Sequence, residues 1–448
     1  MNPAIFRDYD VRGVYPNDLT PEAAKRIGYA FAKFVSQKSR TRHPNLLIAR
    51  DTRASSDILR QNLIEGVLSY GAHVHDMGIA TTPQFYFSVE TRPDMDGAVI
   101  ITASHNPPEY NGFKFVLAKH GEIGAEEGLN QVKKFVLAGK FKHKPYLGGI
   151  NLLTREKERY LKALKRLVPK IEPLRALIDA GGGTVSFMLP ELLSHYPIFY
   201  KPLFFNPDPM FAGHIPNPLS PEVEKIMVHE SKRGNYRIGM SFDGDGDRVS
   251  FFDERGKRIR DDIIFALLAS EALTGRRGLN FVFELTQSRF LGPYIAAHGG
   301  ILHTSKVGGV HVRSKMKEAK AVLGGEISAH IYHGDMHNID SGLLTMLKVL
   351  RLVSSFKKPL SQIVGSVSRS TFHQFEIRLK NPARVLKILE RKHKKHISSK
   401  LDGLSVQYPS WWFNIRMSRT EPILRLTIEA DTEHEMQSRW REIEKLVK

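Results

Sequence analysis

The sequence contains no cysteine among its 448 residues. Disulfide scaffolds, cysteine-type zinc sites and thiol nucleophiles are therefore excluded. Long apolar runs are also missing, since no stretch approaches the roughly 18 residues that a membrane-spanning helix needs. The first ten residues include Arg7, Asp8 and Asp10, which do not fit a secretory signal peptide with an apolar core. We expect a soluble, cytoplasmic protein with no membrane partner.

Negative charge is scarce, because 47 acidic residues face 66 lysines and arginines and leave a formal net charge of +19. Such an excess favours anionic partners, which include nucleic acid, an acidic membrane surface and phosphorylated metabolites. The densest basic run, residues 391–396, continues an apolar helical pattern and has no interleaved aromatic residue that could stack on bases. We interpret this run as a solvated helix end.

The length predicts about three domains at about 150 residues each. Helical patterns alternate with short apolar runs through the first 354 residues, which predicts right-handed crossovers and largely parallel sheets. The expected helices cover 21–35, 55–70, 156–167, 221–231, 262–273, 291–297 and 341–354, and the expected strands cover 46–49, 73–77, 97–101, 174–179, 236–242 and 280–285. After residue 359 the pattern changes to strands, a basic helix and a terminal helix capped at Thr432, which indicates a smaller α+β domain.

Three carboxylates at alternate positions, Asp243, Asp245 and Asp247, are separated by two glycines. The glycines allow the backbone to curl so that all three carboxylates converge on one hard cation. An EF-hand loop also begins with this pattern, but Arg248 stands where its glycine is required, and the flanking segments are typical of strands. A solvated acidic turn is the remaining alternative.

Ser104 follows the expected strand 97–101 directly, at the edge where open parallel sheets place reactive loops. Ser104 is therefore a candidate nucleophile. Its neighbour His105 should point away on an extended segment, so a serine–histidine hydrolase pair is not expected. A helix cap followed by a proline turn is the alternative for this stretch. Lys114, a little further along, would by itself be interpreted as a solvated lysine.

Two later segments carry polar side chains suited to a phosphorylated sugar. The first follows two glycines and has polar residues at alternate positions, Glu326, Ser328 and His330, which would face one way in an extended loop. The carboxylate and hydroxyl groups suit the hydroxyls of a sugar, and the imidazole could exchange a proton near neutral pH. An ordinary polar strand edge is the alternative. The second segment offers guanidinium and hydroxyl groups to an oxyanion from Arg416, Ser418, Arg419 and Thr420, with an exposed basic turn as its alternative.

Together these segments resemble the α-D-phosphohexomutases, and within them the phosphomannomutase/phosphoglucomutase branch. The resemblance rests on residues 6–13, followed in order by the loops of Ser104, Asp243, Glu326 and Arg416. It implies three topologically similar α/β domains with mixed, largely parallel sheets and a smaller C-terminal α+β domain, arranged as a heart around a central cleft. We expect the four domains at 1–146, 147–252, 253–362 and 363–448.

The resemblance also implies a role for each motif. Ser104 would carry a phosphoryl group, and Mg²⁺ would be held by a phosphate oxygen on Ser104 together with Asp243, Asp245 and Asp247. Glu326 and Ser328 would bind sugar hydroxyls, while the loop of Arg416, Ser418, Arg419 and Thr420 would bind the substrate phosphate. The groups expected to move protons and balance charge are Arg12, Lys114 and His330, with support from Tyr9, His105 and Arg248.

The implied reaction is the interconversion of hexose 1-phosphate and hexose 6-phosphate through a phosphoserine and a hexose 1,6-bisphosphate. The expected partner is a phosphorylated hexose rather than nucleic acid, and the expected assembly is a monomer or weak dimer. The alternatives are a phosphoglucosamine mutase and a basic nucleic-acid-binding protein on a mutase scaffold. Arg419, Gly309 and Ala329 depart from residues frequent in the branch, which leaves the choice of sugar open.

Overall fold

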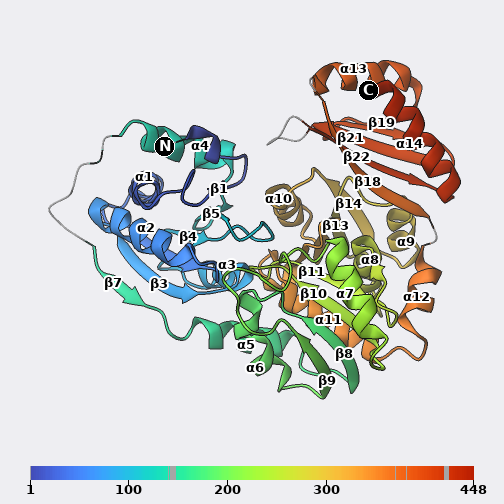
Figure 1. The fold of residues 1–448 in the computed structure, drawn as a ribbon, viewed down its shortest axis with the longest axis horizontal. Helices are drawn as coiled ribbons and strands as arrows, with labels where there is room; N and C mark the ends of the chain where they lie inside the picture. Colours follow the sequence, from blue (N-terminus) through green and yellow to red (C-terminus); the bar gives the residue numbers. More distant parts are fainter. Residues whose placement is uncertain are drawn as a thin grey trace. The chain divides into compact units, whose positions relative to one another are not determined.

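The computed structural model describes residues 2–139, 141, 148–368, 370–379, 381–417 and 423–447. The chain separates into two compact units, one formed by residues 1–264 and 328–361 and the other by residues 265–327 and 362–448. Each unit has its own sheets and helices (Figure 1). None of the helices among the described residues is both long and apolar enough to cross a bilayer.

The first sheet of unit one has the order β1-β5-β4-β2-β3-β7, and β6 pairs with β5. Its parallel centre, β4-β2-β3-β7, is joined to antiparallel β5 and β1. The strands are β1 (Val11–Val14), β2 (Asn45–Arg50), β3 (His73–Ile79), β4 (Gly97–Ile101), β5 (Tyr110–Leu117), β6 (Gly121–Glu122) and β7 (Ile150–Leu152). Its helices are α1 (Pro21–Ser39), α2 (Ser56–Tyr70), α3 (Thr82–Glu90) and α4 (Asn130–Leu137).

Helices α1 and α2 lie side by side over this sheet (Figure 1). Thr20 caps α1 by accepting a hydrogen bond from the backbone of Ala23, and α2 ends at Gly71 in the left-handed conformation. Where the helices cross, a β-carbon on Gly66 would lie 1.9 Å from the carbonyl oxygen of Lys25. Only glycine permits so close an approach, and the resulting packing fixes α2 and the segment that precedes it.

The second sheet of unit one has the order β12-β11-β10-β8-β9. It is parallel from β10 to β9 and antiparallel from β10 to β12. The strands are β8 (Leu174–Asp179), β9 (Ile198–Leu203), β10 (Ile238–Phe242), β11 (Val249–Phe252) and β12 (Arg258–Ile259). The accompanying elements are α5 (Glu156–Leu167), α6 (Leu189–Leu193), α7 (Pro221–Ser231), the hairpin of β16 (Ile331–His333) and β17 (Ile339–Asp340), and α11 (Gly342–Ser354).

Unit two contains a parallel set and an antiparallel sheet. The parallel set places β13 (Asn280–Glu284) between β14 (Ile301–Ser305) and β15 (Leu323–Gly325), with α9 (Leu291–Ala297) and α10 (Gly309–Ala319). The antiparallel sheet has the order β18-β22-β21-β20-β19. Its elements are β18 (Thr371–Arg378), α13 (Pro382–Lys392), β19 (Ile397–Ser399), β20 (Leu404–Gln407), β21 (Trp411–Met417), β22 (Ile423–Ala430) and α14 (Glu433–Val447). Helices α8 (Asp261–Ala272) and α12 (Leu360–Val367) connect the units along the chain.

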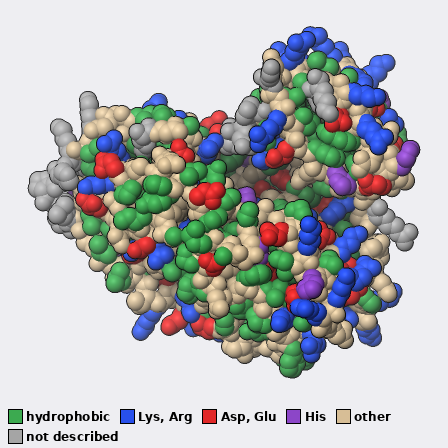
Figure 2. Space-filling model, viewed as in Figure 1, with side chains coloured by type: hydrophobic (Ala, Val, Ile, Leu, Met, Phe, Trp, Pro, Cys, Tyr) green, Lys and Arg blue, Asp and Glu red, His purple; other side chains and the backbone are tan. Residues whose placement is uncertain are grey.

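These sheets confirm the expected fold class of α/β domains with mixed, largely parallel sheets and a smaller C-terminal α+β domain. On the face shown in Figure 2, lysine and arginine side chains are widely spread, and several gather around α13 and α14. The basic run at 391–396 does lie at the end of a helix, with Lys394, Lys395 and His396 exposed, as the sequence predicts.

Candidate active site

Ser104 lies in the loop between β4 and β5 and is only 2% exposed. Its backbone has φ +50°, a left-handed conformation that is uncommon outside glycine, and its N–H donates to Thr102 Oγ1 at 2.9 Å. The Ser104 hydroxyl donates to Asp243 Oδ2 at 2.8 Å. The loop after β4 and the loop after β10 are therefore brought together, as the sequence predicts.

One expectation for this loop is wrong. His105 does not point away from Ser104, because its Nδ1 lies 3.3 Å from Ser104 Oγ. The reason is the left-handed turn at Ser104, which removes the alternation of an extended segment. The positive charge of Arg248 and burial lower the pKa of His105 well below its ordinary value. His105 is therefore neutral near pH 7.

The acidic loop connects β10 to β11, so its flanks are strands and the EF-hand alternative is excluded. Asp243, Asp245 and Asp247 are all buried, which also excludes a solvated acidic turn. Asp243 Oδ1 accepts the backbone N–H of Gly246 at 2.9 Å, where φ is +75°. This left-handed glycine lets the loop curl back on itself so that the carboxylates converge.

Lys114, on β5, is the main cation beside these carboxylates. Its ammonium group donates to Asp247 Oδ2 at 2.8 Å and to Asp245 Oδ2 at 3.2 Å. Burial alone would lower the pKa of Lys114, but the two carboxylates outweigh it and raise the pKa well above the ordinary value. Lys114 is thus a partly buried, charged lysine, although its sequence context alone would indicate a solvated one.

At Asp243, the negative charge of the neighbouring carboxylates is not fully neutralised by the cations nearby. Burial, together with Asp247 and Asp245, raises the pKa of Asp243 well above its ordinary value. Burial would raise the pKa of Asp247 as well, but Lys114, His330 and Arg248 lower it. A cation next to Asp243 would therefore stabilise its ionised form.

The donor set fits a hard divalent cation. One oxygen from each aspartate lies within 4.8 Å of the other two, and the buried Oδ1 atoms of Asp245 and Asp247 accept no hydrogen bond. Oxygen-only ligands of this kind suit Mg²⁺. The sequence-predicted set of three aspartates is thus assembled with two carboxylate oxygens available to a metal.

Arg248 and His330 form a second arm of the same site. Arg248 Nε donates to His330 Nε2 at 2.9 Å and lies 3.8 Å from oxygens of Asp243 and Asp247. His330 Nδ1 lies 2.8 Å from Asp340 Oδ2. In this arrangement Nε2 accepts from Arg248, and Nδ1 carries a proton that it donates to Asp340. Asp340, which follows His330 by ten residues in a hairpin, could not be singled out from the sequence.

Arg12, on β1, points at the Ser104 loop. It donates to Asn106 Oδ1 at 2.5 Å, to the carbonyl oxygen of Ala103 at 3.2 Å and to Asp10 at 2.5 Å. Its guanidinium is therefore positioned beside the candidate nucleophile. Tyr9 lies in the bend just before β1.

The segment that holds Glu326, Ser328 and His330 is not extended, which corrects the sequence expectation that these side chains alternate on one face. Residues 327–329 form a turn, and Ala329 has φ +69°. Glycine would adopt this left-handed backbone freely, whereas the side chain of Ala329 makes it strained. Ser328 is half-buried in unit one.

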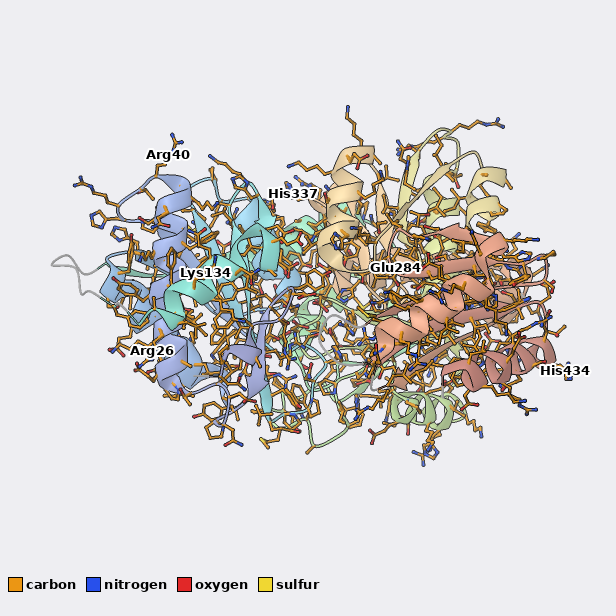
Figure 3. The ribbon with its side chains drawn as sticks, turned by 90° about the horizontal axis from the view of Figure 1, so that it is seen from above. Arg26, Arg40, Lys134, Glu284, His337 and His434 are labelled. Atoms are coloured by element: carbon orange, nitrogen blue, oxygen red, sulfur yellow. The ribbon has the colours of Figure 1, made fainter. Side chains whose placement is uncertain are left out.

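Glu326 itself is buried in unit two and is accompanied by a carboxylate that the sequence did not single out. Glu284, labelled in Figure 3, is the last residue of β13 and accepts the backbone N–H of Ile327 at 3.0 Å. Burial and the charge of Glu326 raise the pKa of Glu284 to about 7, against an opposing effect of Arg416. Arg416 lies at the end of β21, while Ser418, Arg419 and Thr420 lie outside the described residues. Gly309 is the first residue of α10.

Three family models match the chain. The models for phosphoglucomutase/phosphomannomutase α/β/α domains I, II and III match residues 3–143, 158–256 and 260–370. A phosphomannomutase of Methanocaldococcus jannaschii is 32% identical, with 99% of this chain and 97% of the relative aligned. A phosphomannomutase/phosphoglucomutase of Pseudomonas aeruginosa is 31% identical over 97% of this chain and 93% of the relative.

A solved structure has the same fold over the full length. The phosphoglucomutase/phosphomannomutase family protein from Burkholderia thailandensis superposes with a TM-score of 0.90 at 27% identity, covering 100% of this chain and 98% of that one. Fold and sequence thus define an isomerase of the phosphohexomutase class, which transfers phosphate within its substrate. The chain belongs to the phosphoglucomutase/phosphomannomutase family of the α-D-phosphohexomutases.

Proposed function

We propose that this phosphohexomutase interconverts the 1- and 6-phosphates of mannose, glucose or both, through a phosphoserine at Ser104 and a hexose 1,6-bisphosphate. The observation that carries the proposal is the contact of 2.8 Å between Ser104 Oγ and Asp243 Oδ2, inside a buried group of three carboxylates. A reactive hydroxyl beside a site for a divalent cation is what phosphoryl transfer requires.

In the first step a sugar hydroxyl forms a new P–O bond while the bond between phosphorus and Ser104 Oγ breaks. The hydroxyl proton leaves to a base, and Ser104 regains a proton. In the second step the other phosphate of the bisphosphate returns to Ser104 by the reverse bond changes. Mg²⁺ held by Asp243, Asp245 and Asp247 would neutralise charge on the transferred phosphoryl group.

The other side chains of the site in unit one have two roles, charge neutralisation and proton transfer. Arg12 is always charged, and the raised pKa of Lys114 keeps it protonated, so both neutralise negative charge. Among the three candidates for proton transfer, His330 is left as the acceptor, because an imidazole can take up a proton at Nε2, the atom to which Arg248 donates in this structure. Arg248 also supports the acidic loop.

At the substrate's other end, Glu326 and Ser328 would bind sugar hydroxyls, and Arg416, Ser418, Arg419 and Thr420 would bind the existing phosphate. We assign these groups to a domain organisation of 1–146, 147–252, 253–362 and 363–448. The activity is placed in the cytoplasm, since charged sugar phosphates do not cross a bilayer unaided. A monomer or weak dimer is expected and is measurable by light scattering.

The decisive experiment replaces Ser104. The unmodified protein should show an added phosphate on Ser104 by intact mass after treatment with hexose 1,6-bisphosphate, and should lose it when hexose monophosphate is added. Ser104→Ala should take up no phosphate and should not turn over, whereas Ser69→Ala, which removes another buried serine, should behave normally. Normal turnover by Ser104→Ala would refute the covalent mechanism.

The sugar is tested separately by comparing rates on mannose 1-phosphate, glucose 1-phosphate and glucosamine 1-phosphate. Mannose or glucose should dominate. Dominant activity on the amino sugar would replace this proposal by a phosphoglucosamine mutase.

A further inference from the structure

Arg53 is the largest side chain in the described structure that is fully buried. It lies between β2 and α2, on the same edge of the first sheet as the Ser104 loop. Burial lowers the pKa of its guanidinium even though Asp51 opposes this. A guanidinium so far from water is costly unless its donors are used, so its partners indicate what it is there to hold.

The guanidinium donates to the backbone of the Ser104 loop at four points. The acceptors are the carbonyl oxygens of Ser104 (2.8 Å), Asn106 (2.7 Å), Pro107 (2.6 Å) and Tyr110 (3.2 Å). These bonds span the loop from the candidate nucleophile to the first residue of β5. One rigid fork thus fixes the course of the whole loop.

The guanidinium of Arg53 is itself held in place by neighbouring side chains. Asp51 Oδ2 accepts from Arg53 Nε at 3.1 Å, and Asp51 Oδ1 accepts from the backbone N–H of Arg53 and from Ser56 Oγ at the start of α2. The ring of Phe211 lies 5.0 Å from the guanidinium carbon. The loop is therefore tied to β2 and α2, whose packing against α1 is tight.

The Ser104 loop needs such an anchor because its backbone conformation is not favourable by itself. Ser104 is in the left-handed region, where a residue with a side chain is strained and remains only if its surroundings enforce it. The Ser104 carbonyl also lies against the acidic loop, where a β-carbon on Gly244 would come within 2.7 Å of it. A shift of this carbonyl would therefore move the serine relative to Asp243.

We propose that Arg53 is a positioning residue for phosphoryl transfer, which holds the Ser104 loop in its strained conformation so that the hydroxyl stays beside the carboxylate group. This inference rests on the proposed role of Ser104. Arg53 contacts no sugar or phosphate in the proposal, so its loss should slow the chemical step and leave substrate binding largely unchanged.

The test compares Arg53→Lys with Arg60→Lys. Lysine keeps the charge but cannot replace a planar fork that reaches four carbonyls and a carboxylate. Arg60 is the matched control, because it pairs with Asp57 and Asp76 in the same domain but does not hold the Ser104 loop. We expect kcat of Arg53→Lys to fall about 100-fold with KM within about twofold, since small misplacements of reacting groups have effects of this size.

Three readouts separate positioning from stability. The first is the melting temperature of both variants, and the second is their kcat and KM. The third is the rate of phosphate transfer from phosphorylated Ser104 to hexose monophosphate, followed by intact mass. Arg53→Lys should slow this transfer, whereas Arg60→Lys should transfer phosphate at the normal rate at any melting temperature. If Arg53→Lys keeps normal kcat, or if KM alone rises, the proposal is wrong.

If Arg53→Lys does not fold, Asp51→Asn gives the answer. The asparagine amide would place donors against Arg53 Nε and displace the guanidinium while keeping one oxygen for Ser56, so kcat should again fall at constant KM. Normal kcat in Asp51→Asn would overturn the proposal. An inactive Ser104→Ala with a fully active Arg53→Lys would refute positioning alone, whereas an active Ser104→Ala would refute the proposed function itself.

Discussion

Asp245 has one carboxylate oxygen with several partners and one with none. Its Oδ2 accepts from Thr82, Thr102 and Lys114, while the buried Oδ1 accepts no hydrogen bond. Buried polar atoms are nearly always satisfied, so an unpartnered oxygen beside two other carboxylates points to a cation as its partner.

Asp245→Asn should therefore weaken Mg²⁺ binding while keeping the fold. The amide has the same shape but loses the charge, and we expect the Kd for Mg²⁺ to rise at least about tenfold, which corresponds to roughly 1.4 kcal/mol. Titration calorimetry measures this directly. Asp76→Asn, which alters a buried aspartate paired with Arg60, should leave the Kd unchanged. Equal affinities in all three proteins would contradict the assignment of Asp245 as a ligand.

Glu284 should make stability depend on pH. Its pKa of about 7 lies above the ordinary value, so its ionisation is harder in the folded protein. The associated stabilisation is complete below about pH 4.5 and is lost as the pH rises through about 7, and on the order of 3 kcal/mol is involved. Melting temperatures between pH 5 and 8 should fall less in Glu284→Gln than in the unmodified protein. Glu318→Gln, which alters an exposed glutamate, should show the same dependence of melting temperature on pH as the unmodified protein. If Glu284→Gln also shows that dependence, the raised pKa of Glu284 does not control stability.

At the scale of elements, one buried carboxylate joins the two sheets of unit two. Glu429, on β22, accepts from Ser288 Oγ at 2.5 Å, from the backbone N–H of Arg289 at 2.9 Å and from the indole of Trp412. Arg289 also donates to Asp431 at 2.7 Å and to the carbonyl oxygens of Pro409 and Ser410. The segment before α9 is thereby held against the C-terminal sheet.

Glu429→Ala should destabilise this unit by about 2–4 kcal/mol, because the buried donors of Ser288 and Trp412 and the partly buried N–H of Arg289 lose their acceptor. Urea denaturation followed by tryptophan fluorescence suits the measurement, since Trp412 is one of the donors. Glu376→Ala is the control on β18, where an exposed glutamate pairs with Arg425 and should contribute less than about 1 kcal/mol. Equal losses in the two variants would show that Glu429 does not join the sheets.

Elements with a clear hydrophobic period were predictable from the sequence. The bounds of α5, β8, α7 and α9 agree with the predicted ranges, because each combines regular apolar spacing with a recognisable start or stop. Arg53 and Asp340 were not predictable. A buried arginine and a histidine-orienting aspartate are invisible in periodicity, since their roles depend on contacts between segments that the fold alone brings together.

The conformation of the Ser104 loop could not be predicted from the sequence either. Its left-handed serine breaks the local preference of the residue and is enforced by Arg53, which is distant in the chain. The same holds for Ala329, whose turn replaced the expected extended segment. Such departures from local preference are typical of functional sites, where surrounding contacts outweigh propensity.

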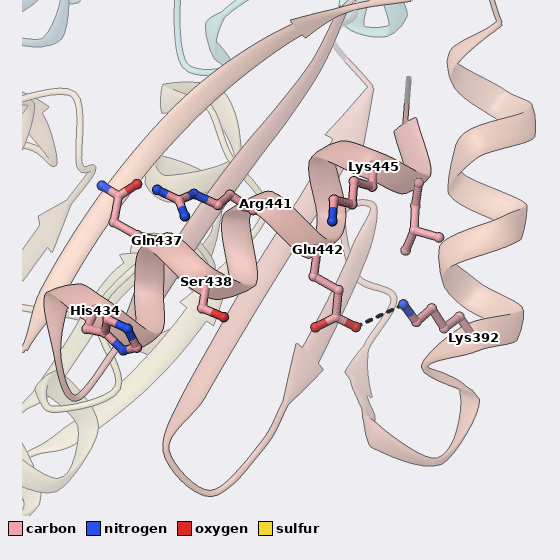
Figure 4. Close-up of a pocket in the computed structure, with 8 residues that line it drawn as sticks. Lys392, His434, Gln437, Ser438, Arg441, Glu442 and Lys445 are labelled. Carbon is pink, nitrogen blue, oxygen red and sulfur yellow. Dashed lines mark hydrogen bonds and ion pairs between the residues drawn. The ribbon is translucent and has the colours of Figure 1, made fainter.

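At the scale of the whole molecule, the net charge of +19 far exceeds what a site for sugar phosphates requires. Part of the excess lies at residues 382–400, where seven lysines and arginines accompany one glutamate. Figure 4 shows Arg441 and Lys445 along one face of α14. They line a pocket of about 550 Å³ with Lys392, which pairs with Glu442 at 2.9 Å. Arg384, Lys387 and Arg391 are exposed on α13 nearby.

This surface separates the mutase from the alternative of a nucleic-acid-binding protein. Replacing Lys387, Arg391, Lys394 and Lys395 together by glutamine should lower the salt concentration at which the protein leaves a heparin column, because counterion release scales with the cations that contact the polyanion. Turnover of hexose phosphate should stay within about twofold, since none of the four belongs to the proposed site and exposed charges at a distance are screened. A loss of turnover of tenfold or more at low salt, which shrinks as the salt concentration rises, would show instead that these charges steer the anionic substrate toward the enzyme.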